Sequence, residues 1–197
     1  MNTERDQISE DILKSIVFGL TGKNASGKGT VAEILKKKNF TYHSLSDSLR
    51  DELKTLKKEE TRENLIDIGN KLREKGGPGV LADKLIPKLN SENNHIVDSI
   101  RNPLEVISLR ETLLRRFFLI SIDADSRLRY DRLCSRGRTG DTDSWEKFVE
   151  QEKKEEINDD PNKQQLSRTM EMADYNIDNS GTLEELEAQV NRIISSL

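Results

Sequence analysis

The sequence predicts an α/β fold, a three-layer sandwich in which a five-stranded parallel sheet lies between helices on both faces. Short apolar runs typical of buried strands alternate with longer stretches whose apolar residues fall at helical spacing. A glycine-rich turn, Gly22 to Thr30, joins the first of these strands to the first helix. Neither a repeat nor a linker interrupts the alternation, so we expect one domain over residues 15–197.

Each predicted strand is a short apolar run bounded by polar or turn residues. The five strands cover residues 15–21, 40–45, 95–98, 117–122 and 175–179. Three predicted helices begin at caps: Ser46, Asn102 followed by Pro103, and Thr182 with Glu185. Parallel strands place their carboxyl ends at one edge of the sheet, so polar residues that follow the strands should meet in one cleft.

Composition narrows the class of protein. Of 197 residues, 33% are hydrophobic and 35% charged, and no apolar run reaches membrane-spanning length. The net charge of −4 argues against stable nucleic-acid binding. Cys134 is the only cysteine and residues 1–14 form a charged extension, which together indicate the cytoplasm. Composition leaves monomer and homodimer both open.

The glycine-rich turn has the spacing of a phosphate-binding loop. Its glycines let backbone N–H groups turn toward an anion, the following helix directs its positive end at the same point, and Lys28 adds a full charge. The alternative is a glycine-rich turn without a ligand, but the strand before it and the helix after it favour ATP binding. The residues expected to bind ATP are Gly22, Lys23, Asn24, Ala25, Ser26, Gly27, Lys28, Gly29 and Thr30.

The loop departs from the usual pattern at its metal-binding position. The hydroxyl residue that normally follows the lysine and coordinates Mg²⁺ is replaced by Gly29, and a hydroxyl comes one residue later, at Thr30. A carboxylate elsewhere should therefore share this task. Asp98 closes the third predicted strand, and we assign it with Thr30 to the metal, although an aspartate there could simply end the strand.

Further charged residues follow strand ends on the same edge. Asp47 and Arg50 come after the second predicted strand, and Arg101 comes after the third. Two guanidinium groups beside a phosphate-binding loop are suited to hold an acceptor phosphate, so Arg50, Arg101 and Asp47 are the predicted acceptor-binding residues.

A run of arginines lies just before a very polar segment. Helical spacing puts Arg129, Arg132 and Arg136 on one side of the predicted helix, and we expect Arg132 and Arg136 to close over the transferred phosphoryl group. The polar segment, about residues 137–165, is a candidate lid.

Two histidines and the cysteine are assigned structural roles. His43 and His95 lie in strand-like runs, and neither has a nearby His or Cys in the sequence that would complete a metal site. Cys134 is expected to be an inert packing residue.

Four segments resemble P-loop kinases, namely nucleoside monophosphate kinases, dephospho-coenzyme A kinase, and the kinase-like domain that precedes some deoxycytidylate deaminases. The segments are 19–30, 46–50, 97–106 and 173–182. The Gly-Lys-Gly-Thr ending of the loop resembles that of adenylate kinase. Asp47 and Arg50 match a Gly-Asp-x-Leu-Arg segment, with Ser46 in place of the glycine. Asp98 and Arg101 resemble an Asp-Gly-Phe-Pro-Arg segment.

The resemblance implies a P-loop NTPase fold with a small helical lid. It also implies that the turn with Asn179, Gly181 and Thr182 borders the donor adenine, and that Arg132 and Arg136 stand at the lid's entrance.

Together these features predict an ATP- and Mg²⁺-dependent phosphotransferase for a small phosphorylated acceptor, a (deoxy)nucleoside monophosphate in the first instance. Its expected catalytic residues are Lys28, Asp47, Arg101, Arg132 and Arg136. Two alternatives stay open: transfer to a hydroxyl, as in dephospho-coenzyme A kinase, with Asp47 or Asp98 as base, and a nucleotide-sensing module that reports to a partner.

Overall fold

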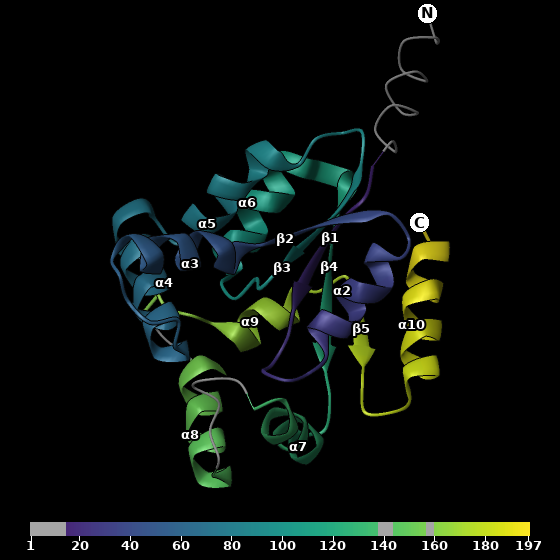
Figure 1. The fold of residues 1–197 in the computed structure, drawn as a ribbon. Helices are drawn as coiled ribbons and strands as arrows, with labels where there is room; N and C mark the ends of the chain where they lie inside the picture. Colours follow the sequence, from purple (N-terminus) through teal and green to yellow (C-terminus); the bar gives the residue numbers. More distant parts are fainter. Residues whose placement is uncertain (1–14, 138–143, 157–159) are drawn as a thin grey trace, which may run out of the picture.

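The computed structural model describes residues 15–137, 144–156 and 160–197, and its centre is a five-stranded parallel sheet (Figure 1). The strand order is β2-β3-β1-β4-β5, so the strand before the phosphate-binding loop is central. In register, Val17 of β1 lies between His95 of β3 and Phe117 of β4. The strands are β1 (Val17–Thr21), β2 (Phe40–Ser44), β3 (Asn94–Asp98), β4 (Phe117–Asp123) and β5 (Tyr175–Asp178).

Helices connect the strands and cover the sheet, as the alternation predicts. The α-helices are α2 (Lys28–Lys36), α3 (Leu45–Thr55), α4 (Arg62–Gly76), α5 (Val80–Leu85), α6 (Pro103–Leu113), α7 (Ser126–Arg136), α8 (Trp145–Glu156), α9 (Leu166–Glu171) and α10 (Leu183–Ser195). Two short 3₁₀ helices, η1 (Ile86–Lys88) and η2 (Leu114–Arg116), follow α5 and α6. None of the helices in the described ranges is long and apolar enough to cross a membrane.

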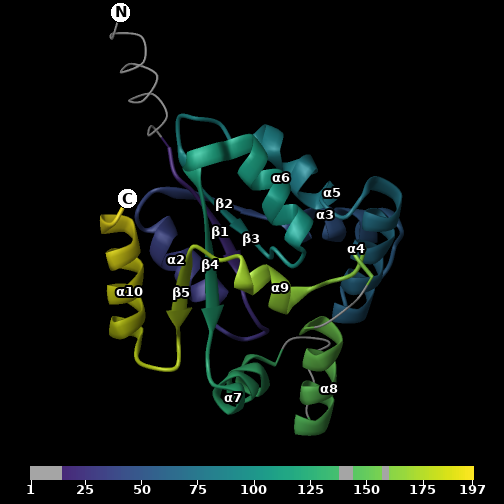
Figure 2. The same cartoon turned by 180° about the vertical axis from the view of Figure 1, so that it is seen from behind.

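Alternation along the strands divides the core into two layers. On β1, Phe18 and Leu20 belong to the cluster that packs against α2 and α10, whereas Val17 belongs to the cluster beneath α3 to α6. Figures 1 and 2 show these helices on opposite sides of the sheet. The predicted three-layer sandwich is therefore confirmed.

The structure corrects several details of the sequence-based assignment. Helix α3 begins one residue before Ser46, and its cap is Ser44, whose hydroxyl accepts a hydrogen bond from the Ser46 amide. Helix α9 was not predicted, because one and a half turns give too few residues for a periodic pattern. The predicted caps at Asn102 and Thr182 are confirmed as capping boxes.

Candidate functional site

The loop between β1 and α2 is held in a conformation that only glycine adopts readily at two positions. Gly22 has φ 141° and Gly27, the N-cap of α2, has φ 100°. A Cβ atom would lie 2.0 Å from the Ile122 carbonyl oxygen at Gly22, and 2.0 Å from Asn179 Nδ2 at Gly27. Both glycines are therefore required by the left-handed backbone and by close packing.

Two side chains, Lys28 and Asn179, donate hydrogen bonds to backbone carbonyl groups of the loop. Lys28 Nζ donates to the carbonyl oxygens of Gly22 and Lys23, at 2.7 and 2.8 Å. Asn179, which is only 6% exposed, donates from Nδ2 to the Ser26 carbonyl oxygen at 2.8 Å. The lysine thus lies across the loop opening, and Asn179 fixes the loop to the end of β5.

The loop forms one end of a cleft of about 700 Å³. Six basic and two acidic side chains line this cleft, although the whole chain has a net charge of −4. The charged lining residues are Lys28, Arg50, Arg73, Arg101, Arg132, Arg136, Glu60 and Asp98. Positive charge is therefore concentrated where the loop would present a nucleotide's phosphates, and attraction for anionic ligands follows from this arrangement.

Asp98 lies at the carboxyl end of β3 and lines the cleft together with Thr30. It is 8% exposed, and its two oxygens accept hydrogen bonds from the Tyr42 hydroxyl at 2.9 Å and the Ser99 amide at 2.6 Å. Burial, together with the adjacent Asp98 charge, raises the pKa of Tyr42, so Tyr42 remains the donor. This orientation leaves further lone pairs on the carboxylate for a metal-bound water.

Within the described ranges, no three His, Cys, Asp or Glu side chains come together as a metal site. A Mg²⁺ ion at this cleft would therefore take most of its ligands from phosphate and water, with Asp98 and Thr30 beside it, a mode that is common for this ion.

The predicted acceptor residues are placed differently from one another. Arg50 lines the cleft, but it donates to Glu60 at 2.7 Å and to Asp47 at 3.0 Å. Burial lowers the pKa of Arg50, yet these two carboxylates outweigh burial and raise it overall. Asp47 is 61% exposed and is engaged by this arginine. Arg101 lines the cleft as well, and its Nη1 lies 3.5 Å from Gln164 Oε1.

Two arginines of α7 face the loop, as helical spacing predicts. Arg132 donates from Nη2 to the Asn179 carbonyl oxygen at 2.9 Å, and Arg136 Nη2 lies 3.5 Å from Asn24 Oδ1. Both line the cleft. The Nη1 atom of Arg132 is buried and has no hydrogen-bond partner among the described residues, so this guanidinium retains donor capacity beside the loop.

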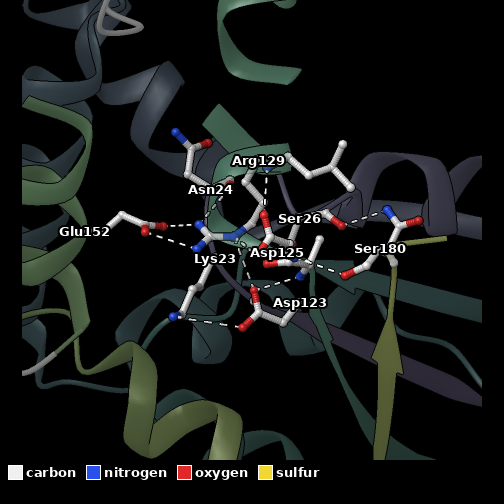
Figure 3. A network of polar contacts seen from close by, with 12 residues as sticks. Lys23, Asn24, Ser26, Asp123, Asp125, Arg129, Glu152 and Ser180 are labelled. Atoms are coloured by element: carbon white, nitrogen blue, oxygen red, sulfur yellow. Dashed lines mark hydrogen bonds and ion pairs between the residues drawn. The ribbon is translucent and has the colours of Figure 1, made fainter. Parts of the chain in front are cut away.

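The third arginine of this row, Arg129, has a different role. It is 1% exposed and forms a paired contact with the carboxylate of Glu152 on α8, while its Nε donates to the Ala124 carbonyl oxygen at 2.9 Å (Figure 3). Its Nη1 also lies 3.5 Å from the Asn24 carbonyl oxygen. Arg129 therefore links the loop, α7 and α8.

The described part of the predicted lid consists of helix α8 with residue 144 before it and of residues 160–165. Its Trp145 and Phe148 rings contact Tyr130 of α7, with centroids 5.4 and 5.6 Å away, and Arg127 lies over the Trp145 ring. The segment is very polar in sequence, yet α8 packs on α7 through these aromatic rings. Residues 138–143 and 157–159 of the predicted lid fall outside the described residues, as does the extension 1–14.

The residues expected near the donor base lie behind the loop and at the start of α10. Asn179 supports the loop as described above. Thr182 is the N-cap of α10, and a Cβ atom at Gly181 would lie 1.9 Å from Glu185 Oε2, so this turn is closely packed around the capping box.

Two expectations outside the cleft need correction. His43 and His95 are partners, because His43 Nε2 lies 3.0 Å from His95 Nδ1 across the β2–β3 pair. Separation by 52 residues hid this contact from sequence reasoning. Cys134 is exposed and does not pack in the core.

The sequence-based assignment missed Tyr42, Gln164 and above all Arg73. Arg73 is 2% exposed and forms a buried ion pair with Glu105, 2.8 Å between Nη2 and Oε1. A signal existed in the sequence, because Arg73 follows Ile66 by two helical turns and so shares its cleft-lining face.

Comparison with known proteins agrees with this geometry. A match to the AAA domain family spans residues 19–158. A UPF0200 protein of Pyrococcus furiosus is 32% identical over 187 residues, which cover 92% of this chain and 97% of the relative. A UPF0200 protein of Pyrococcus horikoshii is 30% identical, with the same coverage.

Solved structures share the fold at low identity. A shikimate kinase of Bacteroides thetaiotaomicron superposes with a TM-score of 0.58 at 14% identity, covering 92% of this chain and 99% of the kinase. A gluconokinase of Sinorhizobium meliloti gives 0.55 at 14% identity, covering 92% and 94%. The five-stranded parallel sheet with its phosphate-binding loop is thus a P-loop NTPase fold of the kinase-like type, and the chain belongs to the UPF0200 family with an AAA domain.

Proposed function

We propose that this protein is an ATP- and Mg²⁺-dependent phosphotransferase whose acceptor is a small phosphorylated molecule, with a (deoxy)nucleoside monophosphate as the first candidate. The observation that carries the proposal is the cleft, in which a phosphate-binding loop and five arginines line one cavity of an acidic chain. One end suits a triphosphate and the remaining arginines suit a second anion, so two phosphorylated ligands are accommodated together.

The loop residues fit a donor nucleotide. The left-handed glycines turn the backbone around an anion, and Lys28 is positioned to exchange its two carbonyl contacts for phosphate oxygens. Arg132 and Arg136, which line the cleft beside the loop, supply further positive charge there. Bound Mg²⁺ would neutralise charge on the phosphates, and Asp98 with Thr30 would hold its water ligands.

In the proposed transfer, an oxygen of the acceptor phosphate forms a bond to the γ-phosphorus of ATP. The bond from that phosphorus to the β–γ bridging oxygen breaks, and ADP leaves with the electron pair. An ionised phosphate needs no base, and catalysis then depends on holding two anions in line against their repulsion. A hydroxyl acceptor would need a base, and Asp47 is engaged by Arg50.

A panel of acceptors tests the proposal. ADP release is measured with Mg-ATP alone and after addition of each (deoxy)nucleoside monophosphate, dephospho-coenzyme A, gluconate or shikimate. We expect a phosphorylated acceptor to accelerate ADP release strongly. Acceleration by gluconate, shikimate or dephospho-coenzyme A, which would receive the phosphoryl group on a hydroxyl, contradicts the proposed acceptor class. Slow release that no acceptor changes favours the nucleotide sensor.

The loop itself is tested by Lys28→Ala. We expect acceptor-dependent turnover to fall by at least about 100-fold with the thermal unfolding midpoint little changed, because a phosphate-directed charge is lost without loss of core packing. Lys36→Ala, on the exposed last turn of the same helix, is the matched control and should keep wild-type activity. Near-normal transfer by folded Lys28→Ala would refute the assignment of the loop.

A further inference from the structure

Arg73 combines burial, charge and incomplete hydrogen bonding in a way that points to a ligand. It lies on α4, lines the cleft and is 2% exposed. Its Nε and Nη2 both donate to Glu105 Oε1, at 3.2 and 2.8 Å. Its Nη1 is buried and has no hydrogen-bond partner within the described part of the chain. An unsatisfied buried donor is costly, and more so on a charged group, so a missing acceptor is the simplest explanation.

Glu105 fixes the guanidinium but has no capacity left for Nη1. Its other oxygen, Oε2, accepts from the backbone amides of Arg101 and Asn102 at 2.9 and 3.1 Å. The carboxylate therefore holds Arg73 through one oxygen and the loop that carries Arg101 through the other. Two cationic side chains that line the cleft are thereby positioned by one buried anion.

A glycine of the same helix lies beside Nη1. A Cβ atom at Gly69, one turn earlier on α4, would lie 3.2 Å from Arg73 Nη1. Glycine in the middle of a helix reduces stability, and here its lack of a side chain lets the Arg73 guanidinium lie close to the α4 backbone. The neighbouring cleft wall is apolar, formed by Leu49, Leu65, Ile66 and Leu81. This combination accommodates an anionic group attached to a largely apolar or planar body.

We propose that Arg73 binds the phosphate group of the acceptor together with Arg101, and that Glu105 is the positioning residue for both. Arg50, whose guanidinium is paired with Glu60 and Asp47, then has a secondary role. The assignment rests on the proposed function insofar as the acceptor occupies this cleft.

Binding of inorganic phosphate tests the inference without turnover. Phosphate is titrated by calorimetry into protein saturated with ADP, so that the loop is already filled. Arg73→Lys keeps a positive charge beside Glu105 but has no counterpart of the Nη1 donor. We expect the Kd for phosphate to rise roughly tenfold or more, because a charge-assisted hydrogen bond is lost. ADP affinity should stay unchanged. Arg110→Lys, which alters the comparable but partly exposed Arg110–Asp174 pair, should bind phosphate like the wild type.

A second variant covers the risk that Arg73→Lys does not fold. Arg73→Met with Glu105→Gln removes both buried charges and keeps an oxygen for the Arg101 and Asn102 amides, so it should fold and still lose phosphate binding. Phosphate binding at wild-type strength in either folded variant, or none in the wild type, would overturn the inference. Tighter binding of malonate than of phosphate would overturn the assignment to a phosphate.

The two proposals fail separately. Arg73-dependent phosphate binding in a protein without acceptor-dependent ADP release supports the anion site and refutes the kinase. Acceptor-dependent ADP release, combined with phosphate binding that does not change in the Arg73 variants, supports the kinase and refutes the anion site.

Discussion

Two glycines of the phosphate-binding loop, separated by Lys28 alone, are under different structural constraints. Gly27 has φ 100° and closely faces Asn179, whereas a Cβ atom at Gly29 would meet nothing within 4 Å. Gly29 lies in the first turn of α2, where the backbone suits any residue. The hydroxyl that is absent from Gly29 is therefore not excluded by space.

Alanine at these two positions should separate the effects. Gly27→Ala is expected to reduce the free energy of unfolding by about 1–3 kcal/mol and to weaken ATP binding, because the left-handed backbone and the Asn179 contact are both disturbed. Gly29→Ala should be neutral or stabilising by about 0.5–1 kcal/mol, as helical alanine replaces glycine. Urea unfolding of both variants measures the difference, and equal losses would contradict the structural account.

The two arginines predicted to bind the acceptor, Arg101 and Arg50, should also differ in their effect on catalysis. Arg101→Ala should raise the acceptor KM or lower kcat/KM by an amount that corresponds to about 1.5–3 kcal/mol, the range for a hydrogen bond to a charged group, while ATP affinity barely changes. Arg50→Ala should have a smaller effect, because Glu60 and Asp47 already neutralise part of its charge. Steady-state kinetics with the acceptor identified from the panel decide the order. Full activity in both variants together with a loss in Asp47→Asn would instead indicate a hydroxyl acceptor.

At the scale of elements, α7 and α8 form a coupled unit. Aromatic contacts join them, and the Arg129–Glu152 pair ties both to the loop (Figure 3). If the lid proposed for residues 137–165 closes over a ligand, α7 and α8 are expected to respond together. The polar composition of α8 alone does not reveal this coupling.

Glu152→Gln tests the coupling. The substitution removes the carboxylate that pairs with both Nη atoms of the buried Arg129 guanidinium and leaves Asp123, 3.4 Å from Nε, which should destabilise the α7–α8 contact and speed amide hydrogen exchange along residues 145–156. Lys153→Gln changes an exposed neighbour on the same helix and should leave exchange as in the wild type. Equal exchange in all three proteins would show that the ion pair does not hold α8.

At the scale of the whole molecule, the sheet brings His43 and His95 together in the neutral state. The Asn90 carbonyl oxygen, 3.2 Å from His95 Nε2, can only accept, so that nitrogen carries the proton and Nδ1 accepts from His43 Nε2. Burial lowers the pKa of both imidazole rings. The nearby charge of Lys88 lowers the pKa of His43 further, whereas the charge of Asp47 raises it. The charge of Arg116 lowers the pKa of His95 further.

Stability should therefore fall in mild acid. A histidine with a depressed folded pKa contributes stability above its unfolded pKa, near 6.5, and loses it as the pH falls. We expect the free energy of unfolding to decrease from pH 7.5 to pH 5.5, as measured in urea. His43→Gln with His95→Gln should reduce this dependence, and an unchanged slope in the double variant would assign it to carboxylates.

Local patterns in the sequence were enough to predict the strands, the loop and the main helix caps of this protein. The five strands, the two required loop glycines and the caps at Asn102 and Thr182 all follow from patterns within a few residues, where backbone preference and hydrophobic period act locally. The position of the cleft at the strand ends followed as well, because parallel strands have a common carboxyl edge.

Tertiary structure decided which charges are buried and with whom. Arg73 and Glu105 are 32 residues apart and Arg129 and Glu152 are 23 apart, so no local pattern identifies the carboxylate with which either arginine pairs. The free energy of a buried ion depends on partners brought close by the folded sheet and on the water that they exclude. For that reason the sequence indicated an arginine-rich cleft, and only the folded chain showed that Arg73 is buried there and that its Nη1 donor has no hydrogen-bond partner among the described residues.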